Sequence, residues 1–190
     1  MAFIPSPMRL YNNRSQRLYL NRSEREQFKE QAHMERQEIR LLCLFLYYTG
    51  VRISEALNVR WEHIQFEEGI VSIRSLKKRN KLDIRELPVP NELVNLLMEQ
   101  HQNNAQARIF KCHRGTALRH IKRVMEHAGI TGSHATARGI RHSFGFACAY
   151  NGIPITLCQR LMGHSDIKIT AIYYNVVGQE ELEMVQRLWD

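Results

Sequence analysis

A chain of 190 residues with 44% hydrophobic content can bury the core of one domain of ordinary size. Its formal net charge of +8, from 27 Lys and Arg against 19 Asp and Glu, suits a polyanionic partner and indicates nucleic acid. The four cysteines lack C-x-x-C spacing, which argues against disulfides and against a zinc site. No run approaches the roughly 20 apolar residues of a membrane span. We therefore expect a cytoplasmic protein that contacts no membrane.

The first third of the chain predicts an arm followed by helices. Residues 1–20 mix Pro, Asn, Arg and Ser with scattered aromatics, which is typical of a flexible basic arm. A helix should begin at Ser23, whose hydroxyl can cap it. The run from Ile39 to Tyr48 is apolar nearly all round and predicts a buried central helix that ends at Gly50. A second helix should open at Arg52 after this turn.

The remainder predicts a small sheet and further helices. Apolar and polar residues alternate over 70–73 and again over 84–89, which predicts antiparallel strands joined by a basic turn. Helices should follow from Asn91, from Thr116 to Ala128, from Arg138 to Asn151, from Pro154 to Gly163, from a cap at Ser165 or Asp166, and over about 179–189. We therefore predict a mainly α protein with a small antiparallel β-sheet (α+β).

Side chains suited to phosphate chemistry gather between positions 138 and 174. Arginine offers a planar fork of donors that matches two phosphate oxygens, histidine exchanges protons near neutral pH, and a tyrosine phenol can attack phosphorus. The residues concerned are Arg138, Arg141, His142, His164, Tyr173 and Tyr174. Together they form a set for phosphoryl transfer without a metal or other cofactor.

Several spaced motifs carry a resemblance to a known family. They are TGVRISEAL at 49–57, a Lys-rich hairpin near position 77, RHSFG at 141–145, LMGHSDIKIT at 161–170, and Tyr173 nine residues after His164. Over about residues 20–185 the chain resembles the catalytic half of tyrosine site-specific recombinases of the phage-integrase, Xer and Fim types. Because several motifs match in order, the signal is stronger than one short pattern.

The resemblance implies an activity and a set of roles. The domain at 21–190 would cleave and rejoin DNA through a 3′-phosphotyrosine link, as integrases and other mobile-element recombinases do. The implied catalytic residues are Arg52, Lys77, Arg138, Arg141, His164 and Tyr173, with Glu55 orienting Arg52, and with Lys78, Arg79, Lys81 and His142 contacting DNA. Lys78 and Lys81 remain alternatives to Lys77. The implied partners are double-stranded DNA and further copies of the chain, as a tetramer in the synapse and a monomer in free solution, with the last helix docked on a neighbouring protomer.

The chain departs from the family pattern in two ways. Most relatives carry histidine at the position of Arg138, and an arginine there cannot accept a proton at any working pH. His134 is a substitute base to consider, although a loop histidine without a role is the simpler interpretation. Most relatives also have an N-terminal core-binding domain, so the sequence is either a catalytic fragment or a small Fim-like recombinase.

Other interpretations remain open from the sequence. A type IB topoisomerase uses the same residue types, and a DNA-binding regulator with the same fold could have lost catalysis, which Arg138 favours. Arg52 could be a surface residue paired with Glu55, and the lysines could be a solvated hairpin tip. His120 and His127 share a helix face, but no acid or cysteine completes a metal site with them.

Overall fold

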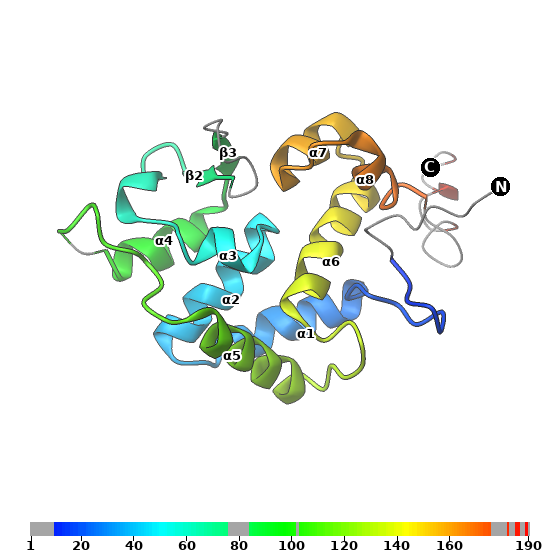
Figure 1. The fold of residues 1–190 in the computed structure, drawn as a ribbon, viewed down its shortest axis with the longest axis horizontal. Coiled ribbons are helices and arrows are strands. Elements are labelled where there is room, and N and C mark those ends of the chain that lie inside the picture. The colour runs from blue at the N-terminus through cyan, green and yellow to red at the C-terminus, as the bar shows by residue number, and fades with distance from the viewer. Residues whose placement is uncertain are drawn as a thin grey trace.

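The computed structural model describes residues 10–75, 84–101 and 103–175, together with Leu182, Val185, Gln186 and Trp189. Helices make up most of this part of the chain, together with one small sheet (Figure 1). They are α1 (Arg22–His33), α2 (Gln37–Thr49), α3 (Ile53–Ala56), the 3-10 helix η1 (Trp61–His63), α4 (Asn91–Glu99), α5 (Arg114–His127), α6 (Ala137–Tyr150), α7 (Ile155–Met162) and α8 (Ile167–Ala171). The predicted fold class, mainly α with a small antiparallel sheet, is confirmed.

The central helix α2 is buried because its residues from Leu41 to Leu46 are all apolar, and burial on all sides is the stable arrangement for such a run. It contacts α1, α4, α5 and α6 and contributes the longest run of core residues. Gly50 ends the helix in the left-handed conformation, with φ of 58°. A Cβ at Gly50 would lie 2.4 Å from the ring of Phe144, so glycine also allows α6 to approach this end of α2.

The sheet has three antiparallel strands in the order β1 (Ile64–Gln65), β2 (Ile70–Arg74) and β3 (Ile84–Pro88). Val71 pairs with Leu87, and Ile73 pairs with Arg85, which places all four side chains in the protein interior. The short strand β1 was not predicted, because two residues are too few to show alternation. The turn between β2 and β3, with Lys77, Lys78, Arg79 and Lys81, lies outside the described residues.

The start of the domain differs from the sequence prediction. Asn21, and not Ser23, caps α1, because its side chain accepts from the Glu24 backbone while the Glu24 carboxylate accepts from the Asn21 backbone. The described part of the expected arm, residues 10–20, packs on the domain. Tyr19 is 3% exposed, and its ring stacks on Phe146 with 5.0 Å between ring centroids. This contact holds Tyr19 against α6, whereas residues 13–16 of the same segment are exposed.

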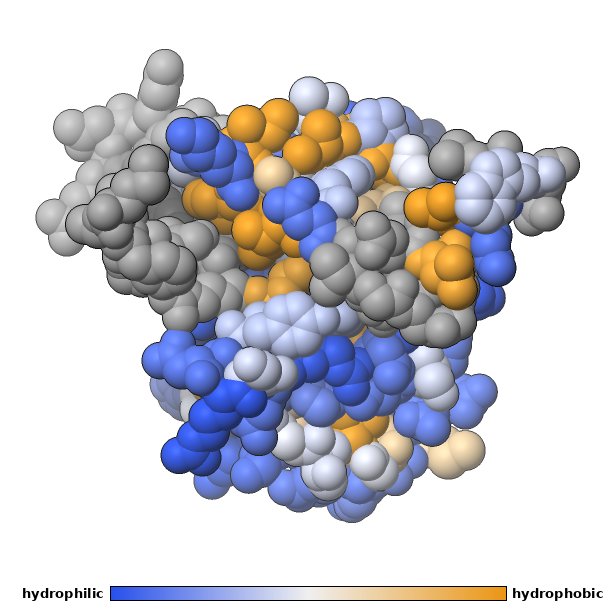
Figure 2. Space-filling model, turned by 90° about the vertical axis from the view of Figure 1, so that its right-hand side faces the viewer, coloured by the Kyte–Doolittle hydropathy of each residue, from blue (hydrophilic) through white to orange (hydrophobic). Residues whose placement is uncertain are grey.

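Helices α6, α7 and α8 form one side of the molecule, on the right in Figure 1. Seen from that side, hydrophobic residues gather on the upper part of the surface, while the lower part is mostly hydrophilic (Figure 2). Ile167 of α8 is among the exposed hydrophobic residues. Among the described residues, no helix has the length and apolar character needed to cross a membrane.

Candidate active site

Arg141 lies at the centre of the site, on α6, with 4% of its surface exposed. Its Nη1 donates to the Gly50 carbonyl and its Nη2 to the Met162 carbonyl, each at 2.7 Å. These carbonyls end α2 and α7, where the helix dipoles favour a cation. Burial and the charge of Arg52 lower the pKa of Arg141 to about 10, so it stays charged at neutral pH. Of its five N–H donors, two are used here, which leaves donors for a phosphate.

Arg52 and Glu55 form the second part of the site, at the start of α3. Glu55 is 3% exposed and accepts from the Arg52 backbone N–H and from its Nη1, each at 2.9 Å. Burial acts to raise the pKa of Glu55, but hydrogen bonds and charge from Arg85, with those from Arg52, outweigh it and lower the pKa. An ionised Glu55 thus fixes Arg52, whose side chain keeps 21% of its surface exposed.

Arg85 is a site residue that the sequence reasoning missed. From β3 it donates through Nη2 to Glu55 at 2.8 Å and through Nε to the Leu161 carbonyl at 3.0 Å. Its guanidinium lies against Gly163, where a Cβ would be 2.6 Å from Nη1. The sequence did hold a signal, because alternation places Arg85 on the same buried face as Leu87. A buried arginine requires acceptors for its N–H groups, such as a carboxylate or backbone carbonyls.

His164 follows the left-handed Gly163 that ends α7, as the sequence predicted. The ring is 7% exposed, and its Nδ1 lies 2.9 Å from the hydroxyl of buried Thr170. It also stacks on Tyr173, with 6.2 Å between centroids and 15° between planes. Thr170 therefore fixes the orientation of His164, and His164 in turn supports the tyrosine ring.

Tyr173 lies after α8 and not on it, which corrects the prediction that the short helix carries it. The helix ends at Ala171, and the Tyr173 backbone N–H donates to the Thr170 carbonyl at 3.0 Å in the following turn. The side chain is fully buried and its ring lies against Gly145, where a Cβ would be 2.6 Å from a ring carbon. Burial raises the pKa of Tyr173, against the lowering effect of Arg141 and other arginines.

The Tyr173 hydroxyl contacts His142, a residue for which the sequence predicted DNA contact. His142 is fully buried, with Nδ1 3.0 Å from the Tyr173 oxygen, so in this structure its ring faces the tyrosine and not the surface. Arg138, one turn earlier on α6, donates from Nε to Nε2 of His142 at 3.1 Å. His134 is not beside Tyr173: its Nε2 lies 3.0 Å from the carboxylate of Glu24. The tyrosine is thus linked to Arg138 through His142.

The described residues thus bring together most of the predicted set. Charges of Arg52, Arg138 and Arg141 act on Tyr173, and His164 stacks on it. The lysines predicted for the basic turn lie outside the described residues. His127 lies near Glu35, with Nδ1 3.4 Å from Oε1. Within the described residues, no three His, Cys, Asp or Glu side chains are grouped as metal ligands.

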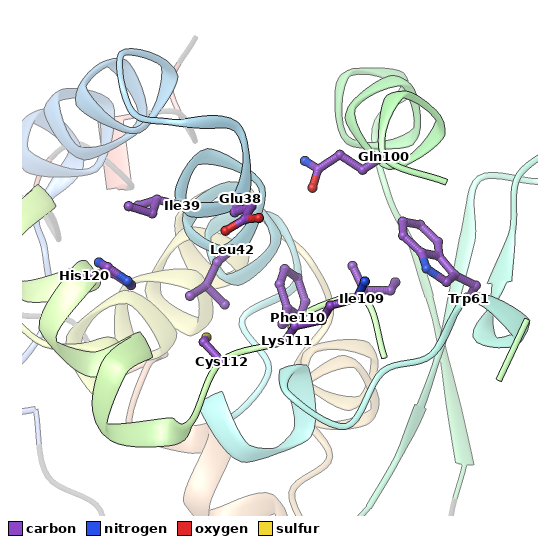
Figure 3. A pocket seen from close by; sticks show the side chains of 10 residues that line it. All are labelled: Glu38, Ile39, Leu42, Trp61, Gln100, Ile109, Phe110, Lys111, Cys112 and His120. Atoms are coloured by element: carbon purple, nitrogen blue, oxygen red, sulfur yellow. The ribbon is translucent and has the colours of Figure 1, made fainter. Parts of the chain in front are cut away.

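A cavity of about 150 Å³ lies away from these residues, beside α2 and the start of α5 (Figure 3). In Figure 3 the aromatic ring of Phe110 and the side chain of Leu42 lie between Trp61 on one side and His120 on the other. The lining consists of Glu38, Ile39, Leu42, Trp61, Gln100, Ile109, Phe110, Lys111, Cys112 and His120. It includes no arginine and none of the residues around Tyr173, so it does not match the phosphate-binding set.

Comparison with known proteins identifies the family of this chain. The model of the Phage integrase family matches residues 18–180. The chain is 31% identical over 163 residues to a tyrosine recombinase XerA of Pyrococcus furiosus, covering 78% of this chain and 54% of that protein. It is 29% identical over 149 residues to a tyrosine recombinase of Thermosipho africanus, covering 75% and 51%. The chain therefore spans about half the length of these curated relatives.

Solved structures show the same fold. A crystal structure of XerA recombinase matches with a TM-score of 0.75 and 25% identity, covering 90% of this chain and 65% of that one. The catalytic domain of bacteriophage HP1 integrase matches with a TM-score of 0.66 and 19% identity, covering 88% of this chain and 93% of that domain. XerH recombinase bound to its difH substrate matches with a TM-score of 0.72 and 19% identity, covering 95% and 60%.

Proposed function

We propose, because this chain belongs to the phage integrase family, that it is the catalytic domain of a site-specific recombinase that cleaves and rejoins DNA through a 3′-phosphotyrosine link. The observation that carries the proposal is the placement of Tyr173 within the field of Arg52, Arg138 and Arg141, with His164 stacked on its ring. Arginines whose charges act on a phenol suit a reaction in which a phosphodiester gains negative charge. We propose that it acts in the cytoplasm, where it would meet a DNA substrate.

The proposed reaction is an exchange of phosphodiesters. The Tyr173 oxygen forms a bond to phosphorus, the bond from phosphorus to the 5′ oxygen breaks, and the electron pair leaves with that oxygen. The leaving oxygen takes a proton from a lysine of the β2–β3 hairpin, for which Lys77 is our choice, and the phenol proton passes to water. Arg52 and Arg141 bind the non-bridging oxygens, where charge accumulates, and His164 donates to one of them. A 5′-hydroxyl from another strand reverses the step without ATP.

The recombinase proposal is favoured over the topoisomerase because the relatives reported above are named recombinases. We further propose that copies of the chain assemble on paired DNA sites, with the C-terminal segment of one copy on its neighbour. Leu182 and Trp189 support this, because their side chains are 49% and 75% exposed and a partner surface would bury them. Deletion of residues 179–190 should weaken assembly of two DNA sites, measured by gel shift, more than binding to one site.

A suicide DNA substrate with a nick near the cleavage position tests the proposed function. The released short fragment diffuses away, so the phosphotyrosine link cannot be reversed and a covalent band accumulates on a denaturing gel. We expect this band in the presence of EDTA, since the proposed chemistry uses side chains alone. If DNA is bound and no covalent band forms, the chain is the regulator considered above. If the band requires a divalent cation, the metal-free mechanism is wrong.

A further inference from the structure

Three side chains form a connected line from the exposed Arg138 to the buried His142 and Tyr173. Arg138 and His142 lie one turn apart on α6, with 3.1 Å between Nε of Arg138 and Nε2 of His142. The other ring nitrogen, Nδ1, lies 3.0 Å from the hydroxyl oxygen of Tyr173. His142 is fully buried, so both of its nitrogens face protein groups. The line joins the residue that departs from the family pattern to the expected nucleophile.

The chemistry of arginine decides which ring nitrogen carries the hydrogen. A guanidinium has only donors, so the nitrogen that faces Arg138 must accept. In a neutral imidazole one nitrogen accepts and the other donates, and therefore Nδ1 of His142 carries the hydrogen. Nδ1 then donates to the Tyr173 oxygen. This nitrogen cannot also take the proton of the phenol, because it has no free lone pair.

We propose that Arg138 locks His142 in the Nδ1–H tautomer, and that His142 is a catalytic hydrogen-bond donor to the attacking oxygen of Tyr173. His142 touches the reacting atom, whereas Arg138 is a positioning residue that acts through His142. The donor stabilises the phenolate that attacks phosphorus, and the phenol proton passes to water instead of to a protein base. This inference rests on the proposed function and explains how arginine serves where most relatives of this type carry histidine.

The charges around His142 agree with a neutral ring. Burial first, and then the charges of Arg138 and Arg141 on the same helix, lower the pKa of His142 to about 4. The groups that face Tyr173 from other elements are Arg52 before α3, His164 after α7 and Cys158 within α7. Protonating His142 would add a hydrogen at Nε2, opposite the donor of Arg138. The ring is therefore neutral over the range from about pH 5.5 to 8 in which an unperturbed histidine titrates.

The tautomer can be measured directly in the free protein. Long-range proton–nitrogen correlation in ¹⁵N-histidine-labelled protein distinguishes the two ring nitrogens, and the His142 signal is identified by its loss in His142→Asn. We expect a neutral ring with hydrogen on Nδ1 from pH 5.5 to 8. In Arg138→Leu the donor is absent, so the Nε2–H form should appear and the pKa of His142 should rise. Hydrogen on Nε2 in the wild type, or an unchanged ring in Arg138→Leu, would overturn the lock.

Covalent capture tests the donor role separately. Asparagine can keep an N–H at the Nδ1 position, and leucine cannot, so His142→Asn should retain a rate within about tenfold of wild type. His142→Leu should lose about a hundredfold, as removal of one oxyanion donor does. Thermal unfolding of both variants shows whether either fails to fold. The proposal would be wrong if His142→Asn and His142→Leu both fold and lose the same fraction of the cleavage rate, while the wild-type rate falls as a histidine protonates. His142 would then be a general base.

The two measurements separate the inference from the proposed function. The tautomer is measured without DNA, so the predicted role of Arg138 can be tested even if the wild type gives no covalent band. A locked Nδ1–H ring without a covalent band would contradict the recombinase activity and with it the catalytic role of His142. A covalent band with an Nε2–H ring would leave the activity standing and reject the role of Arg138.

Discussion

Tyr173→Phe should abolish the covalent protein–DNA product and leave DNA binding intact. The phenol oxygen is the atom that would join phosphorus, and no other group on a phenylalanine ring can replace it. The ring should still fit, because it lies between His164 and Gly145 and the substitution removes only the hydroxyl. Denaturing gels of a suicide substrate measure the product, and a native gel shift measures binding.

Tyr174→Phe is the matched control for this prediction. The Tyr174 hydroxyl donates to the Ile153 carbonyl, and its side chain packs with the small core around Cys158 and Met162. Its loss should cost about 1 kcal/mol of unfolding free energy, the usual value of one hydrogen bond, without removing the covalent band. A band that survives Tyr173→Phe and disappears in Tyr174→Phe would reverse the assignment of the nucleophile.

Periodicity and capping predicted most of the fold. The buried helix from Ile39 to Tyr48 and the left-handed Gly50 after it could be predicted because the run is apolar nearly all round, too short to span a membrane, and followed by glycine. The N-cap of α1 could not, since Asn21 and Ser23 are both good caps and the choice depends on the carboxylate of Glu24. The packing of Tyr19 could not be predicted either, because its contact with the Phe146 ring joins segments far apart in sequence.

The residues of the candidate site could be predicted from the sequence, but the hydrogen bonds between them could not. Motifs indicated Arg52, Arg141 and Tyr173, whereas hydrogen-bond partners depend on which elements pack together. Arg85 therefore escaped notice, although it shares Glu55 with Arg52. For the same reason the contact between His142 and Tyr173 could not be predicted. Sequence shows that His142 follows Arg141, but only the packing of α6 against the turn after α8 shows that it faces Tyr173.

Arg141→Lys should lower the cleavage rate by about a hundredfold or more, on the order of the loss of one oxyanion donor, with a much smaller effect on DNA affinity. Arg141 uses separate nitrogens to reach the carbonyls of Gly50 and Met162. A lysine has one nitrogen, so it cannot hold both helix ends and still present donors to a phosphate. The charge is kept, and the planar fork is lost.

The matched control is Arg36→Lys, which makes the same chemical change at an exposed residue before α2 and should cleave at the wild-type rate. Thermal unfolding must accompany the rate, because a buried arginine bonded to two helix ends also contributes to stability. If Arg141→Lys is folded and binds DNA, a lower cleavage rate means that the substitution destabilises the transition state, in which charge develops on the phosphate. Near-normal cleavage by folded Arg141→Lys would mean that its charge alone suffices, and that Arg141 does not bind the phosphate oxygens as a fork.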